Sequence, residues 1–122
     1  FIDQELERYE LENKDLILIG FSQGTMMSLH VGLRRSSDID GIVGFSGAMT
    51  LPENWKKDIT SKPPTVLIHG EQDNVVPVEL MHQAFIALQG IDVPVENHIS
   101  PGVMHSIGPD GLQKALEFLS KL

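Results

Sequence analysis

Short apolar runs alternate with longer stretches of helical spacing along the chain, and this alternation predicts strands separated by helices. Residues 15–19, 41–47, 65–69 and 93–99 are the predicted strands. The runs at 15–19 and 65–69 contain no regular polar alternation, which is typical of strands that are buried on both faces of a parallel sheet.

Four stretches with apolar residues at helical spacing surround these strands. Helices are predicted over 1–12, over 24–35, from Pro77 to Gly90, and from about Pro109 onward. Residues 48–64 lack either period and are expected to be irregular. The positions expected to face the core are Ile2, Leu6, Tyr9, Met26, Met27, Leu29, Leu33, Met81, Ala84, Phe85, Leu88, Leu112, Ala115, Leu116 and Leu119. The sequence therefore predicts one α/β domain over 1–122, with four mainly parallel strands and helices on both faces.

Composition narrows the classes of partner and chemistry. A hydrophobic content of 41% supports a packed core, and the formal net charge of −8 argues against nucleic acid or an anionic membrane as partner. The chain has no cysteine, so disulfides and thiolate catalysis are excluded. No apolar run approaches the roughly 18 residues of a membrane helix, so we expect no membrane span.

The segment Gly20-Phe21-Ser22-Gln23-Gly24 lies between the first strand and the helix that follows. Gly-x-Ser-x-Gly in this setting indicates a nucleophile elbow, a sharp turn that exposes a serine hydroxyl. The backbone at such a turn is strained and crowded, and glycines at positions 20 and 24 avoid a Cβ clash. The Gln23 amide, at the start of the helix, is the expected oxyanion donor.

Two further reactive side chains follow other strands. Asp73 comes after the third strand and His105 after the fourth. The carboxyl ends of parallel strands meet at one edge of a sheet, so we expect both residues to converge on Ser22. The order Ser, Asp, His is that of α/β-hydrolases. In this hypothesis His105 is the base and Asp73 fixes its tautomer.

Alternatives stay open from the residues alone. Glu71 and Asp92 are rival acids, and His69 and His98 also lie near the predicted edge. Asp73 is also a residue type that turns use for local hydrogen bonds. Metal-ligand spacings are absent, so no metal site is predicted. Phosphate-binding glycine loops are absent too, which makes a flavodoxin-like binding domain the least favoured alternative.

Four segments in order resemble one known family. GFSQG after LILI, then FSG, HGEQDNVVP and PGVMHSI resemble the phospholipase/carboxylesterase family of α/β-hydrolases, which includes serine esterases related to acyl-protein thioesterases. The resemblance implies Ser22, Asp73 and His105 as catalytic residues and Gln23 as an oxyanion donor. It further implies hydrolysis of small acyl esters or thioesters without a cofactor, a cytoplasmic location and frequent dimerisation.

The resemblance also implies strands before residue 15 that this chain does not contain, together with the loop that supplies a second oxyanion amide. The strand at 15–19 would then be an open edge, so we expect either that the chain belongs to a longer parent or that a homodimer buries this edge. The alternative function is a catalytically impaired fragment that serves only as a scaffold or dimerising module. Met49, Leu51 and Trp55, from the irregular segment, are the candidate substrate-binding residues, and Met26 and Met27 are expected to pack in the core.

Overall fold

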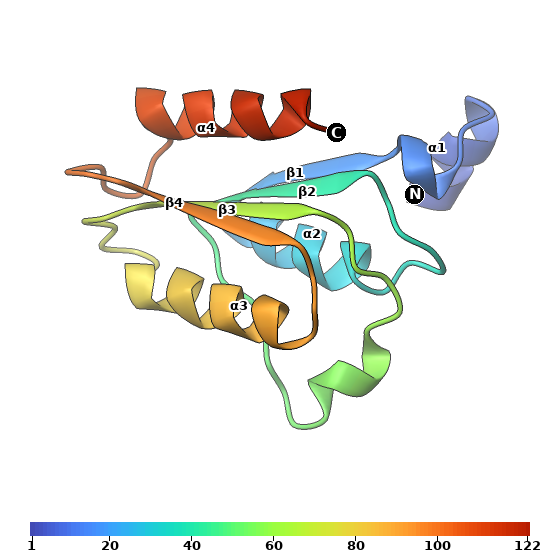
Figure 1. Ribbon diagram of the computed structural model, residues 1–122, viewed down its shortest axis with the longest axis horizontal. Helices are drawn as coiled ribbons and strands as arrows, with labels where there is room; N and C mark the ends of the chain where they lie inside the picture. Colours follow the sequence, from blue (N-terminus) through green and yellow to red (C-terminus); the bar gives the residue numbers. More distant parts are fainter.

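A four-stranded parallel sheet organises the computed structural model, which describes residues 1–122 (Figure 1). The strands are β1 (Ile17–Phe21), β2 (Gly41–Phe45), β3 (Thr65–Gly70) and β4 (Val95–Ser100), in the spatial order β1-β2-β3-β4. All three pairings are parallel. The predicted α/β class and the four parallel strands are therefore confirmed.

Helices cover both faces of this sheet. In Figure 1, α2 (Gln23–Gly32) and α3 (Val78–Gly90) lie below the sheet, and α4 (Pro109–Ser120) lies above it. The lower core joins leucines of α2 and α3 to Ile42 and Leu67. The upper core joins Ala115 and Phe118 of α4 to the opposite faces of β2 and β3. Parallel strands joined by helical crossovers are buried in this two-sided way.

Some predicted boundaries were wrong. The first helix, α1, spans only Ile2–Arg8 and buries no residue, and a 3-10 turn, η1, follows at Asn13–Asp15. Strand β1 begins and ends two residues later than predicted, so it includes Gly20 and Phe21. The irregular segment was predicted correctly, apart from a short 3-10 turn, η2, at Trp55–Asp58.

The expected burial of β1 on both faces was also wrong. Its lower face packs on the core through Leu18, but on its upper face the side chains of Ile19 and Phe21 are 60% and 40% exposed. In α4 the buried residues are Gly111, Ala115 and Phe118, whereas Leu112 and Leu116 of the predicted stripe are about half exposed. Met27 of α2 is likewise 62% exposed. The β1 flank of the molecule is therefore open and apolar.

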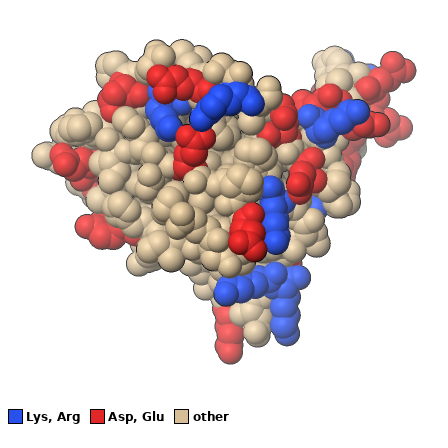
Figure 2. All heavy atoms as spheres, viewed as in Figure 1, with Lys and Arg blue, Asp and Glu red and all other residues tan.

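The opposite flank of the sheet is charged. Glu96 of β4 pairs with Lys114 at 2.8 Å and with Lys121 at 3.0 Å, both from the α4 segment. Figure 2 shows basic and acidic side chains intermingled above the sheet, where α4 lies, and many acidic side chains around α1. The two edges of the sheet thus differ, because ion-paired side chains lie along β4 and apolar side chains lie along β1. Charged side chains at an edge strand disfavour its pairing with another chain. No helix is both long and apolar enough to cross a membrane.

Candidate active site

Ser22 occupies a strained turn between β1 and α2. Its φ of 56° and ψ of −114° are unusual for a residue with a side chain. Phe45 O, at the end of β2, accepts from Ser22 N at 2.8 Å and from Thr25 Oγ1 at 2.7 Å. The turn is thereby fixed to the neighbouring strand, and the serine hydroxyl stands above the carboxyl edge of the sheet.

The glycines of this turn are not equivalent. A Cβ at Gly20 would collide with the backbone of Gly24 and Thr25, so position 20 requires glycine, as predicted. A Cβ at Gly24 would meet no atom within 4 Å, so the predicted clash at this position was wrong. A Cβ built on Gly20 points into the turn, whereas a Cβ built on Gly24 points away from it.

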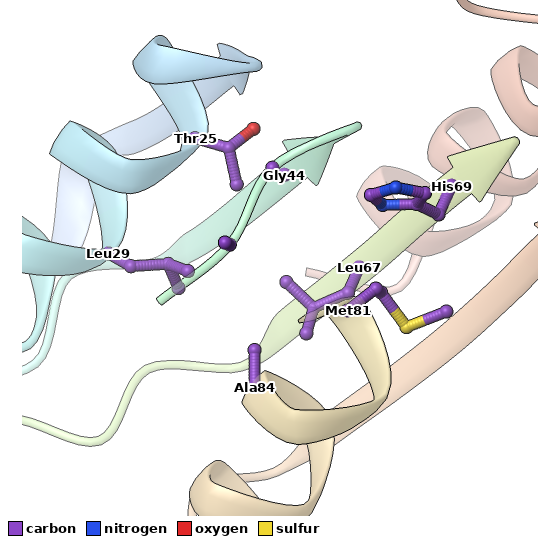
Figure 3. Close-up of a pocket in the computed structure, with 9 residues that line it drawn as sticks. Thr25, Leu29, Gly44, Leu67, His69, Met81 and Ala84 are labelled. Atoms are coloured by element: carbon purple, nitrogen blue, oxygen red, sulfur yellow. The ribbon is translucent and has the colours of Figure 1, made fainter. Parts of the chain in front are cut away.

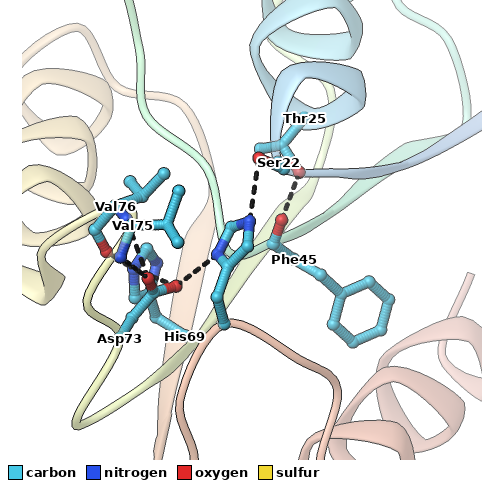
Figure 4. Close-up of polar contacts among 8 residues, drawn as sticks. Ser22, Thr25, Phe45, His69, Asp73, Val75 and Val76 are labelled. Carbon is cyan, nitrogen blue, oxygen red and sulfur yellow. Dashed lines mark hydrogen bonds and ion pairs between the residues drawn. The ribbon is translucent and has the colours of Figure 1, made fainter.

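The structure brings Ser22, His105 and Asp73 into one hydrogen-bonded line (Figure 4). His105 Nε2 lies 3.1 Å from Ser22 Oγ, and His105 Nδ1 lies 2.7 Å from Asp73 Oδ2. An ionised carboxylate only accepts, so Nδ1 donates to Asp73 and Nε2 is left to accept the proton of the serine hydroxyl. Phe21 packs against the imidazole, with 4.9 Å between ring centroids.

A glycine also allows the loop that carries His105 to pass close to the end of β3. The carbonyls of Val103 and Met104 pass so close to Gly70, the last residue of β3, that a Cβ there would overlap them. This contact carries the loop after β4 across the end of β3 toward Ser22. The pattern HGEQD thus places a small residue where the third and fourth strands' loops cross.

Asp73 is the most enclosed member of the line. Its side chain has no exposed surface, and its Oδ1 accepts from Val75 N at 2.9 Å and from Val76 N at 2.8 Å. Burial alone would raise the pKa of Asp73, but the hydrogen bonds from His105, Val76 and Val75 outweigh it and hold the pKa below its ordinary value. The carboxylate is therefore charged at neutral pH and oriented toward His105.

The rival acids are not part of this line. Glu71 Oε1 accepts from Gly102 N at 3.2 Å in an exposed contact. Asp92 follows α3 and precedes β4, so it lies at the amino edge of the sheet, away from Ser22. The choice of Asp73 over these two acids agrees with the geometry.

The rival histidines also have other partners. His98 Nε2 lies 2.6 Å from Asp110 Oδ2, and hydrogen bonds from His98 and Ser100 lower the pKa of Asp110. His69 lies behind Asp73, with Nε2 2.7 Å from Val76 O and 3.5 Å from Asp73 Oδ2. Sequence reasoning treated His69 only as a rival base and missed this placement, although its position four residues before Asp73 on a buried strand was a signal.

Around Ser22 the surface is open. Gln23 is the first residue of α2, where backbone amides have no partner within the helix. A shallow groove beside it is lined by Gln23, Met26, Met27, His30 and Thr50. Of the predicted substrate-binding residues, Met49 packs partly against the lower core, Leu51 is 39% exposed and Trp55 begins η2. None of the three lines this groove, and their role stays a prediction.

No three or more histidine, aspartate or glutamate side chains gather in a way that could hold a metal ion. The polar groups that the structure brings together at this edge of the sheet are a serine hydroxyl, an imidazole and a carboxylate. Such a line can move a proton from the hydroxyl to the imidazole while a nearby amide holds negative charge.

Comparison with known proteins points the same way. The sequence model of the family described as phospholipase/carboxylesterase matches residues 1–122. Acyl-protein thioesterase 1 of Gibberella zeae is 33% identical over 98% of this chain and 53% of its own length, and that of Saccharomyces cerevisiae is 30% identical over 98% and 55%. The crystal structure of esterase PE8 aligns with a TM-score of 0.96 at 41% identity, over 99% of this chain and 56% of the other. The chain thus spans about half the length of these relatives.

Proposed function

The chain belongs to the phospholipase/carboxylesterase family, and from that premise we propose that it is a serine hydrolase acting on carboxyl esters or thioesters. The observation that carries the proposal is the hydrogen-bonded line from Ser22 through His105 to Asp73. A buried carboxylate, an imidazole and an exposed hydroxyl in this order form the arrangement that activates serine for acyl transfer.

The proposed reaction has two steps. Ser22 Oγ attacks the carbonyl carbon of the ester or thioester as His105 Nε2 takes the hydroxyl proton. The Gln23 N–H donates to the oxyanion that forms. In related sites one such donor lowers the barrier by about 3–4 kcal/mol. His105 then gives the proton to the departing alcohol or thiol, which leaves an acyl group on Ser22. In the second step a water gives a proton to His105 Nε2 and attacks the acyl carbon. The bond between that carbon and Ser22 Oγ then breaks, His105 returns the proton to Oγ, and the acid is released.

Asp73 supports both steps without exchanging a proton. Because Val75 and Val76 hold its Oδ1, Oδ2 stays directed at His105 Nδ1. This contact keeps the proton of neutral His105 on Nδ1 and stabilises the imidazolium that forms in each step. Loss of the contact would leave the serine hydroxyl without a base of the correct tautomer.

For the acyl group we propose the groove beside Gln23. Two methionines of α2, Met26 and Met27, line it next to the proposed oxyanion donor. Methionine side chains are flexible and polarisable, and they adapt to apolar groups of varied shape. The originally predicted Met49, Leu51 and Trp55 remain candidates for contacts with a longer acyl chain.

The decisive test is covalent labelling with a fluorophosphonate. We expect one phosphonyl group on Ser22 Oγ, with loss of fluoride, measured by intact mass and peptide mapping. Ser22→Ala should remove labelling, and Ser106→Ala, which changes an exposed serine next to His105, should not. A wild-type chain that labels no faster than Ser22→Ala would contradict the hydrolase proposal.

A second candidate function, a scaffold or dimerising module, is favoured by the open β1 edge. Strand β1 has a neighbour on one side only, and Ile19 is 60% exposed beside that edge. Exposed apolar edge strands pair with other chains. We expect concentration-dependent dimers by light scattering after gel filtration, and their loss in Ile19→Lys but not in Ile86→Lys, an exposed α3 position. A monomeric wild-type chain at high concentration would exclude the homodimer.

A further inference from the structure

Behind the proposed active site lies a histidine that the reaction does not use. His69, the fifth residue of β3, is 1% exposed, and its ring lies in a small apolar space between the sheet, α2 and α3 (Figure 3). The residues around that space are Thr25, Leu29, Gly44, Gly47, Ala48, Leu67, Met81 and Ala84. They leave no room for a water molecule.

The two ring nitrogens of His69 have very different surroundings. Nε2 lies 2.7 Å from Val76 O, and a carbonyl only accepts, so Nε2 carries the hydrogen. Nδ1 is buried and has no hydrogen-bond partner. A buried unpaired nitrogen is unfavourable, and a leucine or methionine would fill the same apolar space without it. The presence of histidine here therefore needs a reason beyond packing.

The contacts of Nε2 supply that reason. Val76, whose carbonyl accepts from His69, donates its own N–H to Asp73 Oδ1. The same Nε2 lies 3.5 Å from Asp73 Oδ2, the oxygen that holds His105. Figure 4 shows the His69 ring behind Asp73 and the loop that carries Val75 and Val76. A rigid strand is thus connected to the acid through one ring nitrogen.

We propose that His69 is a positioning residue of this site: its Nε2–H braces the 73–76 loop and keeps Asp73 aimed at His105. The inference rests on the proposed function, because a brace for the acid affects catalysis only if His105 acts as the base. Small displacements of a catalytic group reduce rates by about 10²-fold, so loss of the brace should lower kcat by about 10–100-fold with little change in KM.

Two substitutions with side chains of equal length isolate the role of the Nε2–H donor. In His69→Gln the amide nitrogen is as many bonds from Cβ as Nε2 is, so it still reaches Val76 O. His69→Met has the same length and no donor. With p-nitrophenyl butyrate as substrate, we expect His69→Gln to retain kcat within about threefold and His69→Met to lose it by about 10–100-fold. Leu67→Val, which changes the same apolar space without touching Val76, should behave like the wild type.

Nuclear magnetic resonance of the imidazole groups gives a readout that does not depend on activity. His69 should be the Nε2–H tautomer, and the proton of His105 Nδ1 shared with Asp73 should persist in His69→Gln and weaken or vanish in His69→Met. If the wild type fails to label at Ser22 but the His105 signal follows residue 69 in this way, the hydrolase proposal falls and the brace stands. Equal kcat and equal His105 signals in the two variants, or the Nδ1–H tautomer at His69, would overturn the inference.

Discussion

The substitution Asp73→Asn tests the proposed role of the buried carboxylate in fixing the tautomer of His105. The amide oxygen of asparagine can still accept from Val75 N and Val76 N, as Asp73 Oδ1 does. Its NH₂ group would then replace Oδ2, which accepts from His105 Nδ1 at 2.7 Å in the native chain. Two donors would face each other, so His105 would turn to the tautomer with its proton on Nε2.

That tautomer cannot take the proton of Ser22 Oγ, which lies 3.1 Å from Nε2. The same exchange in the serine protease triad lowers kcat by about 10⁴, or roughly 5.5 kcal/mol in the barrier. We expect a loss of this size in the hydrolysis of p-nitrophenyl butyrate. The fold should survive, because both loop hydrogen bonds to residue 73 are kept, and circular dichroism and urea unfolding will check this.

The matched control is Glu71→Gln, which removes a carboxylate two residues away that accepts an exposed hydrogen bond from Gly102 N. Its kcat should stay within about threefold of the wild type, because the exposed contact does not orient His105. The mechanism would be refuted if Asp73→Asn kept more than about a tenth of the wild-type rate, since correct orientation by the acid is worth far more than that. Equal losses in the two variants would refute the choice of acid.

Two further outcomes are expected. Gly20→Ala should destabilise the fold by about 1–3 kcal/mol in urea unfolding, because a Cβ there meets the backbone of Gly24, whereas Gly24→Ala should be tolerated; equal stability would contradict this account of the turn. Hydrogen bonds from Lys114 and then Lys121 hold the pKa of Glu96 below its ordinary value. The stability they provide is present above about pH 4.3 and is lost as pH falls through the lowered pKa, so Glu96→Gln should flatten the acid limb of the unfolding curve, by less than about 1 kcal/mol for so exposed a pair.

The sequence predicts where the strands lie along the chain and which loops carry the reactive residues, because both depend on local signals. Apolar runs mark the strands, and Gly20 fixes the turn at Ser22 through a contact made within five residues. Asp73 and His105 could be placed at the same edge because parallel strands bring their carboxyl ends together. No long-range packing detail was needed for either step.

What could not be predicted depends on neighbours that a one-dimensional pattern does not identify. In α4 two apolar stripes lie side by side, and only packing decides that Phe118 is buried against the sheet while Leu116 stays about half exposed. The helical period is the same for both stripes. The role of His69 was missed for a similar reason, since it depends on the carbonyl of Val76 and on the space left by α2 and α3.

The direction of β1 relates the open flank to the space above Gln23. Ser22 follows the carboxyl end of β1, so a strand added in parallel would end beside it, and the loop after that strand would reach the space above Gln23. A two-fold dimer pairs β1 with its own copy in antiparallel fashion, which brings the start of the partner strand to that place instead. Dimerisation would therefore bury the apolar edge without supplying an amide from a strand's carboxyl-end loop. It follows that association and labelling at Ser22 should be separable in this chain.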